Sequence, residues 1–138
     1  MKIRRMKSFR KLLLLIPLLL AGASAFAQQD GYDVFVPISK YITQGNVEAL
    51  SAWFDDTLEV TILSKGGDAS KPQAKQIVKS FFDSYTPRSF VITHKAGKGN
   101  MKYALADLKA GGETFRVTIF VTCRKNSFLI QQIKVDRP

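Results

Sequence analysis

The sequence has one cysteine, Cys123, and one histidine, His94, among its 138 residues. A single cysteine cannot form an intrachain disulfide, and one cysteine with one histidine supplies too few ligands for a tetrahedral zinc site. The phosphate-binding pattern G-x-x-x-x-G-K-[S/T] and the hydrolase pattern G-x-S-x-G are both absent. The sequence therefore contains no positive signal for an enzyme, and we expect neither a metal nor a cofactor.

Acidic residues are also sparse, and the one place where they gather does not match a calcium loop. Asp55, Asp56 and Glu59 lie close in the sequence, but the spacing D-x-D-x-D-G is missing. We interpret this segment as the solvated start of a strand.

No apolar run is long enough to span a bilayer. The longest, residues 12–20, follows a basic segment and precedes Ala25-Phe26-Ala27. A basic segment, a short apolar run and an A-x-A site are typical of a secretory signal peptide. We expect cleavage after Ala27, a mature chain of residues 28–138 with no integral membrane segment, and a periplasmic or secreted location.

Removal of this leader changes the charge of the protein. Six of the 21 basic residues and none of the 11 acidic residues lie within residues 1–27, so the formal net charge falls from +10 to +4, the difference between fifteen basic and eleven acidic residues. Nucleic acid is therefore not an expected partner. The basic residues that remain cluster in the second half, where a polyanion or an acidic lipid headgroup could bind them, or where they could form an ordinary solvated rim of a sheet. This basic set is Lys95, Lys98, Lys102, Lys109, Arg116, Arg124, Lys125, Lys134 and Arg137.

The hydrophobic pattern of the mature chain predicts two short helices, a strand, a long helix and four further strands. Gly45 separates the two short helices. The capping box Ser70-x-x-Gln73 begins the long helix and Pro87 ends it. We expect that helix, residues 71–85, to bury Ile77, Val78 and Phe81. The expected strands are 58–62, 89–94, 101–108, 113–123 and 128–135, with a loop over 64–69.

Short turns between the last four strands indicate an antiparallel meander. One apolar face of this sheet needs cover, and only the three helices are available for it. We therefore predict a single α+β domain, in which a curved antiparallel sheet of about five strands wraps around the helices as a cone.

The predicted element order carries a resemblance to a known superfamily. The opening segment ISKYITQGNVEALSAWF and the closing hairpins resemble the nuclear transport factor 2-like (cystatin-like α+β) superfamily. More narrowly, SKPQAKQIVKSFF, SFVITHKAG and FLIQQIKV are similar to a domain-of-unknown-function family of secreted bacterial proteins. The shared motifs are structural, so the resemblance implies the fold and says little about the activity.

Two function classes remain open. The first is a non-enzymatic binding or interaction module for a small apolar ligand or an envelope protein. Its candidate pocket residues near the ends of elements are Tyr41, Trp53, Tyr85 and His94. The alternative is a small-molecule isomerase or dehydratase, which the superfamily resemblance implies, with His94 and Asp107 as the acid–base pair. Whether Asp107 points inward depends on whether its hairpin turn has three or four residues.

A patch of apolar residues on the outer side of the sheet suggests self-association. If residues 124–126 form a three-residue turn, Val121 pairs with Leu129 and Ile119 with Gln131. This register places Phe120, Phe128 and Ile130 together on the side that should be polar. Superfamily members often dimerise through this surface, so the resemblance implies a two-fold homodimer. The alternatives are that three exposed apolar side chains are ordinary, or that the register is shifted by one residue.

Overall fold

The computed structural model describes residues 33–124 and 126–138. The expected signal peptide, residues 1–27, lies outside the described residues. The contacts divide the chain into two units, Met1–Asp33 and Val34–Pro138.

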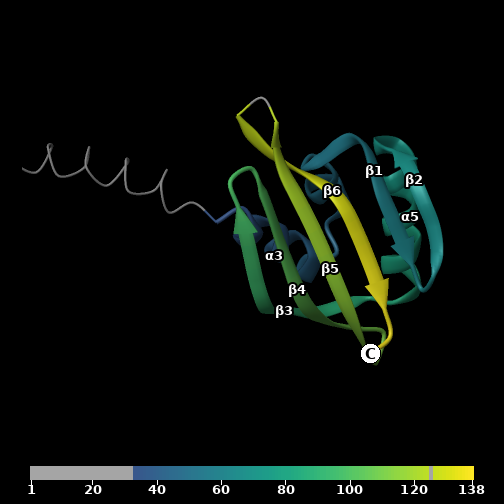
Figure 1. Ribbon diagram of the computed structural model, residues 1–138. Helices are drawn as coiled ribbons and strands as arrows, with labels where there is room; N and C mark the ends of the chain where they lie inside the picture. The colour runs from purple at the N-terminus through teal and green to yellow at the C-terminus, as the bar shows by residue number, and fades with distance from the viewer. Residues whose placement is uncertain (1–32, 125) are drawn as a thin grey trace, which may run out of the picture. The chain divides into compact units, whose positions relative to one another are not determined.

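The second unit is built on a six-stranded sheet in the order β2-β1-β6-β5-β4-β3 (Figure 1). All neighbouring strands are antiparallel except β1 and β6, which are parallel. The prediction of a curved, mostly antiparallel sheet is confirmed. The strands are β1 (Phe54–Ile62), β2 (Lys65–Ser70), β3 (Pro87–Lys98), β4 (Met101–Ala110), β5 (Glu113–Arg124) and β6 (Ser127–Asp136).

The sixth strand, β2, corrects the predicted loop over residues 64–69. Leu63 and Ser64 turn the chain with positive φ angles, and Lys65–Ser70 then pairs with Thr57–Ile62. Gly66 and Gly67 also have positive φ angles, and a Cβ at Gly66 would collide with the carbonyl oxygen of Val60. Two glycines indicate a loop from sequence, but here they let an edge strand approach β1 closely.

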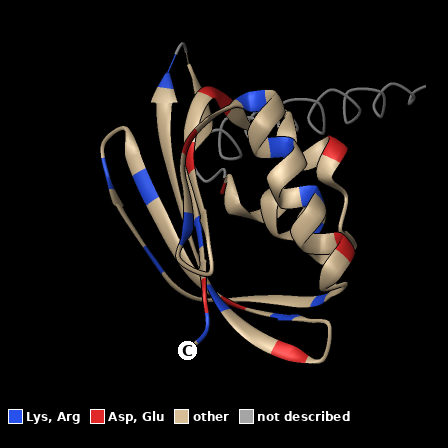
Figure 2. Ribbon diagram, turned by 90° about the vertical axis from the view of Figure 1, so that its right-hand side faces the viewer, with Lys and Arg blue, Asp and Glu red and all other residues tan. Residues whose placement is uncertain are grey.

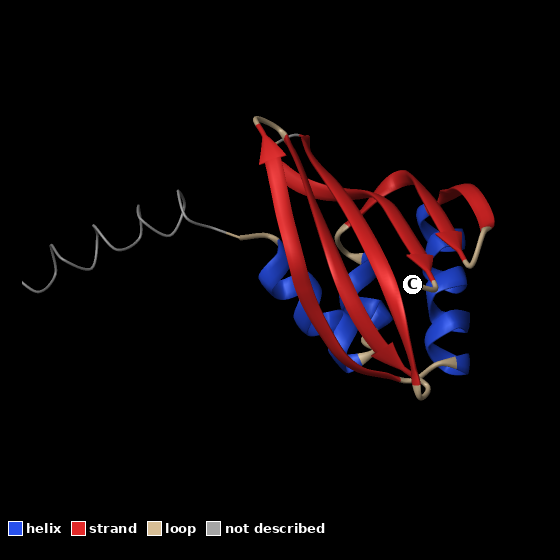
Figure 3. Cartoon of the chain, turned by 60° about the horizontal axis from the view of Figure 1, so that its bottom comes forward, coloured by secondary structure: helices blue, strands red, loops and turns tan. Residues whose placement is uncertain are grey.

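Three helices cover one face of the sheet (Figure 3). They are α3 (Phe35–Gln44), α4 (Val47–Ser51) and α5 (Lys71–Ser84). Gly45 ends α3 in the left-handed conformation, with φ of 67°. The predicted capping box of α5 is confirmed, since Gln73 N–H donates to Ser70 Oγ and Ser70 N–H donates to Gln73 Oε1. Among the described residues, no helix is both long and apolar enough to cross a membrane.

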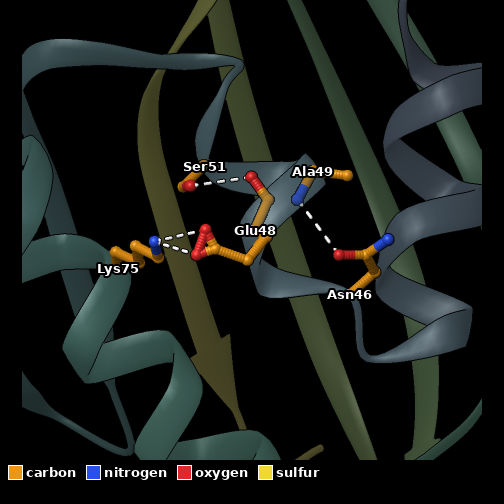
Figure 4. A network of polar contacts seen from close by, with 5 residues as sticks. All are labelled: Asn46, Glu48, Ala49, Ser51 and Lys75. Carbon is orange, nitrogen blue, oxygen red and sulfur yellow. Dashed lines mark hydrogen bonds and ion pairs between the residues drawn. The ribbon is translucent and has the colours of Figure 1, made fainter.

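Polar contacts fix the short helix α4 in place (Figure 4). Asn46 caps it by accepting a hydrogen bond from Ala49 N–H at 3.1 Å. Glu48 forms an ion pair with Lys75 of α5, with Lys75 Nζ 2.6 Å from Glu48 Oε1. Ser51 Oγ donates to the Glu48 carbonyl oxygen at 3.0 Å. The ion pair therefore joins α4 and α5 on the side that faces solvent, while the apolar sides of both helices face the sheet.

The core lies between the helices and the sheet. Helix α5 contributes Ala74, Val78 and Phe81, whereas Ile77 is 36% exposed. The prediction that Val78 and Phe81 are buried is confirmed, and the prediction for Ile77 is wrong because the buried stripe follows 74, 78 and 81. The sheet contributes alternate residues, among them Ala104, Ala106, Leu108, Phe115, Val117, Ile119 and Val121.

Two of the three register shifts in the meander decide which of the predicted site and patch residues face the helices. Ile92 pairs with Ala106 but His94 pairs with Leu105, so Thr93 is an extra residue in β3. Phe120 pairs with Gln132 but Val121 pairs with Ile130, so Gln131 is an extra residue in β6. Each extra residue reverses the alternation of inner and outer side chains beyond it.

Candidate functional site

Among the described residues, side chains fill nearly all of the space between α5 and the sheet. A cavity of about 20 Å³ between α5 and the sheet is large enough for about one water molecule. Its walls are apolar, so an enclosed small ligand of the predicted kind has no room there. The lining residues are Ile42, Leu50, Ile62, Val78, Phe81, Phe82, Leu108, Val117, Ile133 and Val135.

None of the four predicted pocket residues lines this cavity. Tyr41, Trp53 and Tyr85 are half-buried and pack against the core. The Tyr85 ring centroid lies 5.0 Å from that of Phe115, and Arg137 Nη2 donates to its hydroxyl at 3.4 Å. Trp53 accepts a backbone hydrogen bond from Ile130 at 2.7 Å. Tyr85 therefore ties the end of α5 to the sheet through its side chain, whereas Trp53 joins β6 through its backbone carbonyl.

His94 and Asp107 do not point into the cone, which corrects the expectation for an acid–base pair there. Because of the extra Thr93, His94 pairs with Leu105 on the outer face, and its ring lies 5.9 Å from that of Tyr103. Asp107 pairs with Val91 and Arg116, which are exposed. Cross-strand partners share a face, so both groups lie on the side away from the helices.

The structure instead builds a polar cluster that the sequence did not indicate, at the start of β1. Asp55, expected to be solvated, is 3% exposed, while Asp56 and Glu59 are exposed as predicted. Arg124 Nη1 lies 2.5 Å from Asp55 Oδ2, and Gln131 Nε2 donates to the same oxygen. The other carboxylate oxygen accepts the Asp56 backbone N–H at 2.7 Å.

The hydrogen bonds keep Asp55 charged. Burial by itself would raise the pKa of the Asp55 carboxyl. The Asp56 backbone N–H, the Arg124 guanidinium and the Gln131 amide together outweigh burial and hold that pKa below its ordinary value. A carboxylate saturated by three donors is a poor proton acceptor for a substrate, so the cluster suits a structural role. It ties β1 to the hairpin between β5 and β6.

The predicted self-association patch is only partly on the outer face. Phe120 lies on that face, as expected, and pairs there with Tyr103 and Gln132. Ile130 is fully buried opposite Val121, and Phe128 packs against the core opposite Cys123. The prediction for Ile130 and Phe128 is wrong because the expected register is wrong. Arg124 pairs with Ser127, so Val121 faces Ile130 and not Leu129, and the extra Gln131 then reverses the alternation along β6.

A different set of apolar residues joins Phe120 on that face. Thr122 pairs with Leu129, and Leu105 lies two residues along β4 from Tyr103. We call the outer patch the half-buried residues Tyr103, Leu105, Phe120 and Leu129. Met101 and Val91, which are 49% and 58% exposed, flank it. The helices lie on the opposite side of the sheet and leave this patch uncovered (Figure 3).

Comparisons with known proteins agree on the fold. The family described as "Domain of unknown function (DUF4783)" matches residues 35–136. A solved protein of that family from Bacteroides uniformis is 24% identical, with a TM-score of 0.73, and the alignment covers 77% of this chain and 98% of that one. No curated protein matches the chain.

Two more distant structures are similar in fold alone. One is a domain with a cystatin-like fold from Nostoc punctiforme, at 12% identity and a TM-score of 0.60, covering 75% of this chain and 72% of that one. The other is a protein from Cytophaga hutchinsonii described as NTF2-like, at 12% identity and a TM-score of 0.57, covering 75% and 85%. The predicted resemblance to this fold is therefore confirmed.

Proposed function

The chain belongs to the DUF4783 family, a domain of unknown function with an NTF2-like fold, and from this premise we propose that it is an exported, non-enzymatic interaction module. The observation that carries the proposal is the apolar outer patch on a sheet face that no helix covers. The filled space under the sheet supports a partner that binds the surface rather than a ligand held inside.

A second copy of the chain is the partner that this face fits best. Oppositely charged residues lie in one row on the same face, where Asp107 pairs with Arg116 and Arg116 with Asp136. In a two-fold dimer the same surface meets itself, so the acids of one copy can face the bases of the other around the apolar centre. The outer patch would then be buried at the centre of the interface.

The dimer is tested by placing a charge in the outer patch. We expect residues 28–138 to sediment as a dimer at micromolar concentration and the Phe120→Arg variant to sediment as a monomer, because a buried unpaired guanidinium strongly opposes association. Val36→Arg is the matched control, since Val36 is 66% exposed on α3, and it should remain a dimer. A monomeric wild-type protein, or loss of the dimer in both variants, would contradict the proposed interface.

Export is tested separately by the mass of the mature protein. When the full chain is expressed in a bacterium of the Bacteroides group, we expect the exported protein to begin at Gln28, within a residue or two. Intact-mass measurement of the cell envelope and medium fractions gives the answer. A chain that still carries residues 1–20 in those fractions would contradict the signal peptide.

A further inference from the structure

Two neighbouring hairpin turns form one basic end of the sheet. We define the hairpin tips as residues 98–102, between β3 and β4, and the described residues 124 and 126–128, between β5 and β6. We propose that the hairpin tips dock on the surface of an anionic lipid bilayer. This inference adds a lipid partner to the proposed interaction module and does not depend on its dimerisation.

The two tips are held together. Cys123 N–H donates to the Asn100 carbonyl oxygen at 2.8 Å, which joins the end of β5 to the turn before β4. Lys102 Nζ lies 4.7 Å from the centre of the Phe128 ring, so the second contact also bridges the two hairpins. The ion pair of Arg124 with the buried Asp55 anchors the second tip on β1. The tips therefore present one connected surface.

The hairpin tips themselves carry charge of one sign, and of the two acidic residues next to the second tip, Asp55 is paired with Arg124 while Asp56 is exposed. Residues 88–106 and 117–135, which contain both hairpin turns, include no Asp or Glu. Figure 2 shows blue segments on both hairpins, whereas the helical side carries red and blue together. Among the described residues, Asp55 is paired with Arg124, while Lys98 and Lys102 have no acidic partner. A single-signed surface attracts an anionic bilayer, and each Lys or Arg near that surface strengthens binding about fivefold.

Protection of the sheet edges against aggregation does not by itself explain where these basic residues lie. Lysines that guard a sheet against aggregation belong on its edge strands. Here Lys102 lies in β4 and Arg124 in β5, and both strands have neighbours on either side. Lys98 ends the edge strand β3, so the charges gather at one end of three neighbouring strands and not along the edge strand alone.

Exposed apolar groups within the tips favour a bilayer over a soluble polyanion. Met101 is 49% exposed and lies between Lys98 and Lys102 in the sequence. Phe128 lies on the other face of the sheet, where it is half-buried under the Lys102 ammonium. A thioether and a ring flanked by long basic side chains match the interface of a membrane, where the apolar groups enter and the charges remain at the headgroups.

Vesicle co-sedimentation tests the proposal on residues 28–138. The solved Bacteroides uniformis relative is aligned over 98% of its own chain, so we expect a chain of this extent to fold by itself. We expect binding to vesicles of equal parts phosphatidylglycerol and phosphatidylcholine, little binding to pure phosphatidylcholine, and loss of binding at high salt. Lys98→Glu with Lys102→Glu should lower the partition coefficient by about thirtyfold or more, and Met101→Ser should lower it further.

The matched control carries the same change of charge on the helical side. Lys71→Glu with Lys79→Glu alters α5, where Lys79 already pairs with Asp83, and should leave vesicle binding within about twofold. Circular dichroism checks that both double variants are folded. An equal loss in the two double variants would mean that only net charge matters and would overturn the proposal. Binding to heparin without binding to the anionic vesicles would identify a soluble polyanion as the partner and would also overturn the proposal. The absence of binding to either would overturn it as well.

Discussion

Replacing Phe81 with alanine is expected to lower the free energy of unfolding by about 3–5 kcal/mol. Phe81 is the residue of α5 whose ring packs against Phe115 of the sheet. It is 6% exposed, and its ring centroid lies 5.2 Å from those of both Phe115 and Tyr85. Alanine removes these ring contacts and leaves a cavity that the neighbouring strands cannot fill without moving.

The control for this prediction lies one turn earlier on the same helix. Ile77 is 36% exposed, so Ile77→Ala should cost only about 1 kcal/mol or less. Equilibrium unfolding in urea, followed by circular dichroism, measures both variants against the parent protein. Equal losses for the two, or a loss below about 1 kcal/mol for Phe81→Ala, would mean that α5 packs on the sheet with another face.

The helices were predictable from sequence because their signals are local. The Ser70 and Gln73 pair contains the whole capping interaction, and Gly45 ends α3 within one turn of the residues that it stops. The spacing of apolar residues in 71–85 places two of the three expected core residues correctly. Ile77 was misassigned because it lies at the boundary of the apolar stripe, where spacing alone does not decide the side.

The side-chain directions in the sheet were less predictable because one extra residue reverses them. Nothing in residues 90–94 marks Thr93 as the extra residue, so His94 was expected inside the cone and lies outside it. In β6 a signal was present, since Ile130 and Ile133 are separated by two glutamines instead of one polar residue. That spacing breaks the period of two and is typical of a bulge.

The bulge in β6 also explains why the polar cluster was missed. Gln131 is the extra residue, and its amide reaches Asp55, which is 76 residues away in sequence. Arg124 reaches the same carboxylate across 69 residues. Contacts over such separations depend on β1 lying beside β6, a parallel pairing that the alternation of residues within either strand does not indicate.

Asp55→Asn is expected to lower the free energy of unfolding at neutral pH by about 2 kcal/mol, a size typical of hydrogen bonds to a buried charged group. The neutral amide of asparagine lacks the negative charge to which Arg124 and Gln131 donate their hydrogen bonds. If its NH₂ group takes the place of that oxygen, donors face donors and the hydrogen bonds are lost. The Arg124 side chain is 55% exposed, so water compensates part of the loss on that side. Urea unfolding gives the difference. Asp56→Asn, at an exposed neighbour that keeps its backbone N–H, should stay within about 0.5 kcal/mol.

The difference between the parent protein and Asp55→Asn should also depend on pH, with a sign set by the folded-state pKa. The pKa of Asp55 is held below its ordinary value in the folded protein, so the charged carboxylate favours folding. This contribution is fully present above the unfolded pKa of about 3.9 and is lost as the pH falls through the lower folded pKa. The free energies of unfolding of the two proteins should therefore differ by a constant amount from neutral pH to about pH 5. They should converge below about pH 4. A difference that grows on acidification would mean that burial dominates and that Asp55 is protonated more readily in the folded state than in the unfolded one.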